Sequence, residues 1–179
     1  MQQLRSGFQQ GVLTALQTLR FPPDFHFVSH RVSLAASGPM QIELMYLGGR
    51  DIDGDAKELI RSDARNRLGD SNATVALRWL PDSVLLQPFP RSETTVAPNN
   101  IRQLDEVAVL LRDAPSLQVE VLTSGARNES NEVAEARAKA VIDYLVDRHA
   151  IARERFTVAQ GKGADRTVIV TLHAPAATR

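Results

Sequence analysis

Four prolines in the middle of the chain constrain its fold most, because proline cannot continue a helix or a central strand. They are Pro81, Pro88, Pro90 and Pro98. The hydrophobic pattern before them differs from the pattern after them, so we place a domain boundary beside Pro81. The sequence therefore predicts a small domain over residues 1–81 and a second domain over residues 82–179. A chain of 179 residues is long enough for two such domains.

The first domain is predicted in the order helix, strand, strand, helix, strand. The first helix has apolar residues at spacings of three and four, which are Leu4, Phe8, Val12, Ala15, Leu16 and Leu19. Two alternating strands follow around a turn at Gly38-Pro39, the first with Val28, Val32 and Leu34 on one face and the second with Met40, Ile42, Leu44 and Tyr46. A helix over residues 51–69 and a strand over 73–79 complete a two-layer sandwich. This order is similar to that of BON-type domains.

The second domain is predicted as a strand over 83–87, a helix that Asn99 or Asn100 caps and Pro115 ends, and an alternating strand over 117–121. A long helix over 131–149 and two closing strands, over 156–158 and 168–172, follow. The predicted fold class is α+β, with two two-layer α/β sandwiches. The second sandwich has the order β-α-β-α-β-β.

Three segments of the second domain resemble the OmpA-like C-terminal domain family. They are VLLQPFPRSETTVAPNNIRQLDEVAVLLRDAP, LQVEVLTSGARN and ARAKAVIDYLVDRHAIARERFTV. The resemblance implies an OmpA-like fold and recognition of the peptidoglycan stem peptide. In the family, an aspartate that follows a threonine and an arginine in the next helix recognise diaminopimelate. Arg137 matches that arginine, but Ser124 stands where the aspartate is expected.

The resemblance gives a candidate ligand-binding set of Thr123, Ser124, Asn128, Asn131, Arg137 and Arg166. Serine cannot supply a charge-assisted hydrogen bond to an ammonium group, which is worth about 1.5 to 3 kcal/mol, so we expect weakened peptidoglycan binding. Arg137 also shares a helix face with Val133 and Val141, on the stripe turned toward the sheet. Two interpretations stay open. Arg137 either binds an anion beside the loop or extends to solvent at the edge of that face.

Neither motifs nor composition indicate an enzyme, a metal site or a cofactor. The 21 basic and 21 acidic residues balance, which does not favour nucleic acid, and the chain has no cysteine. The acidic run from Asp51 to Asp55 lacks the glycine and glutamate of a calcium loop, so we expect it to cap a helix. His26 and His30 are predicted on one strand face, about 13 Å apart, which is too far for one metal ion. We treat these histidines, His149 and His173 as structural.

The sequence favours a non-enzymatic module of the bacterial cell envelope that binds peptidoglycan or an envelope protein through residues 123–137. The alternative is a structural or assembly domain of a larger membrane protein that has lost ligand binding. No apolar run approaches the roughly 18 residues of a membrane span. We therefore expect a soluble region, with any membrane anchor outside the given chain, and the resemblance implies a location in the periplasm or cell envelope.

Overall fold

The structure is a computed structural model that describes residues 11–33, 38–126, 128–161 and 164–175. The chain divides into two compact units, Met1–Leu80 and Pro81–Arg179. Each unit is a sandwich of sheet and helices, so the predicted α+β class with two sandwiches is confirmed. That the two units are separate folding domains stays a prediction. Within the described ranges, no helix combines the length and the apolar character that a membrane crossing requires.

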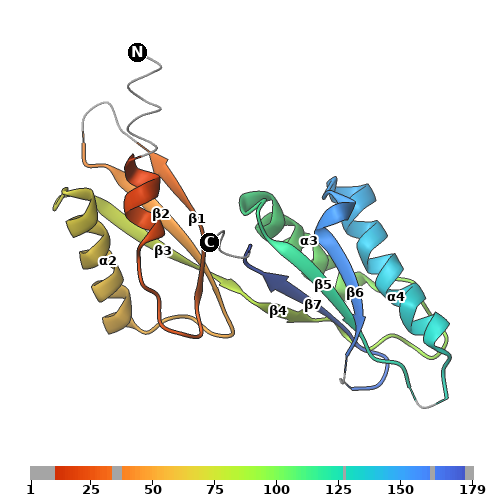
Figure 1. The fold of residues 1–179 in the computed structure, drawn as a ribbon. Coiled ribbons are helices and arrows are strands. Elements are labelled where there is room, and N and C mark those ends of the chain that lie inside the picture. Colours follow the sequence, from red (N-terminus) through yellow and green to blue (C-terminus); the bar gives the residue numbers. More distant parts are fainter. Residues whose placement is uncertain (1–10, 34–37, 127, 162–163, 176–179) are drawn as a thin grey trace. The chain divides into compact units, whose positions relative to one another are not determined.

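The first unit packs its helices on one face of a three-stranded sheet with the order β1-β2-β3 (Figure 1). Residues 11–17 are helical, and β1 (His26–Ser33), β2 (Gln41–Gly48), α2 (Gly54–Leu68) and β3 (Thr74–Pro81) follow. The core joins apolar side chains of both layers, including Leu16, Leu44, Tyr46, Ile60 and Val75. The element order agrees with the prediction, while the predicted core residues Leu4, Phe8 and Leu34 lie outside the described residues. The similarity to BON-type domains stays a prediction.

A β-bulge in β1 changes which of its side chains face the helices. The register against antiparallel β2 shifts between Phe27 and Ser29. The opposite pairs are Phe27 and Tyr46, His30 and Leu44, and Val32 and Ile42. Because a bulge inserts one extra residue, it reverses the alternation of side chains, and Phe27 shares the core face with Val32 in place of Val28. The predicted Val28–Val32 face is therefore wrong, and His26 and His30 do not share a face.

Capping residues at both ends of α2 set its limits. The Asp53 carboxylate accepts a hydrogen bond from the backbone N–H of Ala56 at 2.8 Å, as expected for the acidic run. Gly69 follows the last turn with φ 65°, a left-handed conformation that glycine adopts without steric strain. The prediction began the helix at Asp51, but that carboxylate lies before the helix and binds Lys57 Nζ at 2.6 Å.

In the second unit, α3 and α4 cover one face of a four-stranded sheet (Figure 1). Its elements are β4 (Ser83–Leu85), α3 (Pro98–Asp113), β5 (Gln118–Thr123), α4 (Asn131–Asp143), a π-helical turn (Tyr144–Arg148), a 3-10 turn (Arg153–Arg155), β6 (Phe156–Gln160) and β7 (Val168–His173). The sheet order is β4-β7-β5-β6, with β6 parallel to β5 and the other pairs antiparallel. The predicted β-α-β-α-β-β order is confirmed, but β5 separates the two closing strands.

The start of α3 differs from the prediction that an asparagine caps it. The residue before the helix is Ala97, which forms no side-chain cap, and Pro98 occupies the first turn. Asn100 instead lies in the first turn of the helix and is only 1% exposed. Its side chain accepts a hydrogen bond from the Gln87 N–H at 2.8 Å and donates one to the Gln87 carbonyl at 3.1 Å. Asn100 thus ties α3 to the segment that follows β4.

Candidate functional site

A polar pocket of about 230 Å³ lies where β5 ends and α4 begins. Its lining comes from β5, the loop after it, α4 and the end of β6, through Thr123, Gly125, Ala126, Glu129, Asn131, Ala134, Gln160 and Gly161. Thr123 and Gln160 are opposite residues in the parallel ladder of β5 and β6. The pairing of β5 with β6 therefore forms one wall of the pocket, and the loop that leads into α4 forms the other.

Arg137 is almost fully buried beside this pocket, with 1% exposure, and does not line it. Its Nε donates to the Glu93 carbonyl at 2.9 Å, and Nη2 donates to the Pro90 carbonyl at 3.1 Å. The guanidinium carbon also lies 5.6 Å from the centre of the Phe89 ring. Arg137 therefore lies on the buried stripe of its helix and binds groups of the protein itself, and the interpretation in which it extends to solvent is wrong.

Glu129 is the ionic partner of Arg137, and the sequence reasoning missed it. Its carboxylate accepts hydrogen bonds from Arg137 Nη1 at 2.8 Å and Nη2 at 3.0 Å. It also accepts one from the Ser92 N–H at 2.9 Å. The hydrogen bonds from Arg137 and then from Ser92 lower the pKa of Glu129 to about 2, so the carboxylate is ionised at neutral pH. Glu129 lies in the loop before α4, where no regular period predicts which side chains meet.

Ser124 occupies the position of the expected aspartate but points its hydroxyl into the protein. The Ser124 hydroxyl donates to the Gly161 carbonyl at 3.1 Å, and its backbone N–H donates to the Thr167 carbonyl at 3.0 Å. Ser124 is 8% exposed and is not a lining residue. Its contacts hold the end of β5 against the segment that precedes β7.

The remaining candidate ligand-binding residues, Asn128, Asn131 and Arg166, lie in different parts of the second unit. Asn131 lines the pocket as the first residue of α4, whereas Asn128 lies in an exposed turn and is not a lining residue. Arg166 has φ 62° and accepts a hydrogen bond from the Phe89 N–H on its carbonyl at 2.9 Å. Its Nε is buried without a hydrogen-bond partner in the described part of the chain. The pocket thus brings together Thr123 and Asn131, while Ser124, Asn128, Arg137 and Arg166 lie outside its lining.

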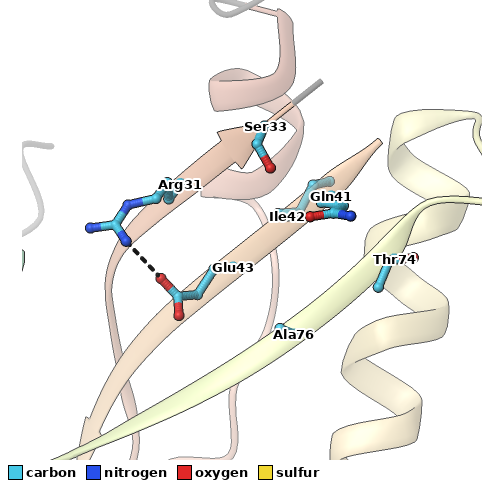
Figure 2. A pocket seen from close by; sticks show the side chains of 7 residues that line it. All are labelled: Arg31, Ser33, Gln41, Ile42, Glu43, Thr74 and Ala76. Atoms are coloured by element: carbon cyan, nitrogen blue, oxygen red, sulfur yellow. Dashed lines mark ion pairs between the residues drawn. The ribbon is translucent and has the colours of Figure 1, made fainter. Parts of the chain in front are cut away.

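A second cavity, of about 270 Å³, lies on the three-stranded sheet of the first unit. Figure 2 shows Arg31 on β1 and Glu43 on β2 pointing toward each other, and their ion-pair distance is 3.6 Å. The other lining residues are Ser33, Gln41, Ile42, Thr74 and Ala76. Because its two charged side chains pair with each other, this open cavity offers no uncompensated charge from its lining to a ligand.

The histidines do not form a metal centre among the described residues, where no group of three or more histidine and acidic side chains could hold an ion. His149 lies 2.8 Å from an Asp105 oxygen, and the same oxygen accepts the Tyr144 hydroxyl at 2.7 Å. These contacts join α3 to the π-helical turn after α4. His173 Nε2 is 3.5 Å from the Glu120 carboxylate on the neighbouring strand. The His149 and His173 contacts therefore each connect neighbouring helices or strands of the second unit.

A known protein family matches most of the second unit. The model of the OmpA family matches residues 88–177. Similar solved structures include the OmpA-like domain of FopA1 from Francisella tularensis, with 16% identity, a TM-score of 0.43, and coverage of 52% of this chain and 75% of that one. The peptidoglycan-associated lipoprotein from Burkholderia pseudomallei has 14% identity and a TM-score of 0.43, with coverage of 51% and 90%.

The periplasmic domain of MotB from Helicobacter pylori, residues 78–256, is also similar. It has 13% identity and a TM-score of 0.40, with coverage of 52% of this chain and 76% of that one. A search of curated proteins finds no significant match.

Proposed function

The chain belongs to the OmpA family through residues 88–177, and on that premise we propose that its second unit binds peptidoglycan in the periplasm through the pocket beside Thr123. OmpA-like domains are commonly peptidoglycan-binding modules of the cell envelope and are not enzymes. The prediction that the chain is not an enzyme is confirmed by this membership. Peptidoglycan as the ligand, and the residues that contact it, are the proposal.

The observation that supports this function is the polar pocket itself. Its volume of about 230 Å³ suits one small polar group of a larger ligand. The side chains of Thr123, Asn131 and Gln160 provide neutral hydrogen-bonding groups, and Glu129 provides an ionised carboxylate. Glu129 gives the pocket an acidic group, whereas serine stands at position 124, where the resemblance predicts an aspartate.

The second candidate function is a structural or assembly role without a ligand. The observation in its favour is that Arg137 directs its hydrogen bonds to Glu129, Glu93 and Pro90. An arginine held this way, with 1% exposure, does not meet a ligand in the pocket. This candidate predicts an intact fold and no affinity for the cell wall.

Co-sedimentation with purified peptidoglycan sacculi separates the two candidates. Replacing Arg137 would be a poor test, since its loss also removes a buried ion pair. Gly125 lines the pocket, and a Cβ there would meet only Ala134 Cβ at an ordinary 3.9 Å. We expect Gly125→Ala to sediment like the wild type, and Gly125→Leu, which fills the pocket, to remain in solution. Wild-type protein that stays in solution at low salt would reject the proposal and favour the structural role.

A further inference from the structure

The strand β6 forms one edge of the four-stranded sheet and pairs, among the described residues, with β5 alone (Figure 1). Natural sheets protect such an edge with charged side chains, prolines or covering segments, because unpaired backbone groups readily pair with another chain. The opposite edge, β4, has three residues, and the Gln103 side chain donates a hydrogen bond to its Leu85 carbonyl at 3.3 Å. The five residues of β6 carry neither a charge nor a proline. The edge at β6 is therefore the less protected of the two.

The hydrogen bonds between β6 and β5 show which backbone groups of β6 face outward. The Gly161 N–H donates to the Thr123 carbonyl at 2.9 Å. Backbone groups alternate between the two sides of a strand, so every second residue counted back from Gly161 faces β5. Phe156, Val158 and Gln160 consequently direct their backbone groups to the outer side of β6. The Val158 side chain is also 49% exposed.

These outward groups are complementary to those of a second copy in antiparallel orientation. A twofold axis at Val158, the central residue of β6, sets Val158 opposite the partner's Val158 and Gln160 opposite the partner's Phe156. The Phe156 N–H already donates to the Arg153 carbonyl, so the Phe156 carbonyl remains as an acceptor. Two hydrogen bonds then join the Val158 residues, and one runs from each Gln160 N–H to the carbonyl of the partner's Phe156. Because β6 is uncharged, no like charges meet along the pairing.

We propose that β6 is a self-association edge, at which a second copy of the chain adds its own β6 in antiparallel pairing centred on Val158. Such a twofold interface uses the same residues of both copies and is the commonest assembly of soluble proteins. One short edge covers less than the roughly 800 Å² per partner of a stable interface, so the dimer is reversible and forms at high protein concentration. The pairing places the partner's Phe156 opposite Gln160, which lines the pocket, and thus holds the strand that forms one pocket wall. This association does not depend on peptidoglycan binding.

Sedimentation velocity of the full chain, from micromolar to millimolar concentration, measures the association. We expect the wild type to shift from monomer to dimer as its concentration rises. Val158→Lys and Val158→Glu each bring two like charges together at the axis, so each should raise the apparent dissociation constant of the dimer at least about tenfold. Val109→Lys is the matched control, because Val109 is 44% exposed on α3 and lies on no strand edge. The control should associate like the wild type.

An equimolar mixture of the two charged variants tests the register. Because position 158 faces itself across the axis, Val158→Lys and Val158→Glu should form a mixed dimer although neither associates alone. A mixture that stays monomeric while both variants are folded contradicts the axis at Val158. Wild-type protein that is monomeric at every concentration, or a Val158→Lys variant that associates like the wild type, overturns the proposal. A monomeric wild type would leave the edge to an extended segment of another protein.

Circular dichroism verifies that the variants are folded at the assay temperature. If a charged variant does not fold, Val158→Pro replaces it, because proline removes an outward N–H and leaves the hydrogen bonds between β6 and β5 in place. We expect Val158→Pro to be folded and monomeric. Association of the proline variant at the wild-type level would reject the pairing through this edge.

Discussion

Arg137 and Glu129 are charged side chains placed where water is almost absent, with 1% and 4% side-chain exposure. Moving two charges out of water is unfavourable, and their attraction offsets that cost only when the geometry is close and the remaining polar groups are bonded. Both conditions hold, since Arg137 also binds two backbone carbonyls and Glu129 also binds the Ser92 N–H. The pair thereby joins α4 to the loop before it and to the segment that follows β4.

Removal of one member of this pair is expected to destabilise the second unit strongly. Arg137→Ala leaves Glu129 buried without its cation, and loss of one partner of a buried pair costs about 3 to 5 kcal/mol. Urea denaturation followed by circular dichroism measures the change. Lys139→Ala on the same helix is the control, because Lys139 is 73% exposed and pairs with Asp143 at the surface. We expect the control to change stability by less than about 1 kcal/mol, and equal effects of the two variants would contradict the buried-pair interpretation.

Acid should weaken the folded state through Glu129. Its pKa is lowered from 4.5 to about 2 by hydrogen bonds from Arg137 and Ser92. A carboxyl group with a lowered folded pKa contributes stability that is fully present above its unfolded pKa, here about 4.5, and is lost as the pH falls toward 2. The melting temperature of the wild type should therefore fall more steeply between pH 5 and pH 2 than that of Glu129→Gln. Glu132→Gln should keep the wild-type profile, and parallel curves for wild type and Glu129→Gln would count against the assignment.

At the residue scale, the sequence predicted the inward position of Arg137 but not its partner. The spacing of Val133, Arg137 and Val141 places the arginine on the buried stripe of α4, because a regular helix fixes side-chain directions. Glu129 lies in a loop, where the path of the backbone decides which side chains meet. Ser124 was assigned from a family position, yet its hydroxyl bonds to Gly161, a contact that depends on the end of β6.

Among the elements, the C-terminal end of α3 depends on a side chain from a distant segment. Arg155 donates from Nε to the Leu117 carbonyl at 2.9 Å, from Nη1 to Leu111 at 3.0 Å and from Nη2 to Ala114 at 3.1 Å. Carbonyls at a helix end lack partners within the helix, and a cation there also meets the negative end of the helix dipole. Burial lowers the pKa of Arg155, which nevertheless remains protonated.

Loss of this arginine should destabilise the second unit. Arg155→Met keeps much of the alkyl volume and removes three hydrogen bonds to backbone carbonyls, so we expect a loss of about 2 to 4 kcal/mol in urea denaturation. Arg153→Met is the matched control two residues earlier, because Arg153 is 56% exposed and pairs with Asp143 at the surface. A control as unstable as Arg155→Met would show that the carbonyl contacts contribute little.

Hydrophobic periodicity predicted most of the elements but not their neighbours in the sheets. The alternation of apolar residues over 117–121 predicted β5, because one face of that strand is buried under helices. It could not reveal that β5 lies between β7 and β6, because periodicity in one strand says nothing about its partners. The bulge in β1 was likewise missed, and one extra residue was enough to exchange Val28 for Phe27 on the core face.

At the scale of the whole chain, family membership and ligand are separate questions. The match over residues 88–177 shows the family, while Ser124 lies outside the lining of the pocket and Glu129 supplies the acidic group there. A fold can be retained while the residues of its site change. The first unit lies before the matched region and adds its own core and its own cavity.

The proposed boundary beside Pro81 predicts that the two units unfold separately. Trp79 is the single tryptophan of the chain, and it lies in β3, where its Nε1 donates to the Gly48 carbonyl at 2.8 Å. Its fluorescence should therefore report the first unit, while far-ultraviolet circular dichroism reports both units. With separate unfolding, Arg137→Ala should lower the midpoint of one part of the circular dichroism transition and leave the fluorescence transition unchanged.

A variant in the first unit should produce the reverse pattern. A Cβ at Gly48 would overlap the Phe25 ring, so Gly48→Ala should lower the fluorescence midpoint, whereas a Cβ at Gly54 meets no atom within 4 Å and Gly54→Ala should not. The part of the circular dichroism transition that responds to Arg137→Ala should be insensitive to Gly48→Ala. If every destabilising variant instead moves both signals together, the chain unfolds as one cooperative unit and the boundary beside Pro81 does not separate independent domains.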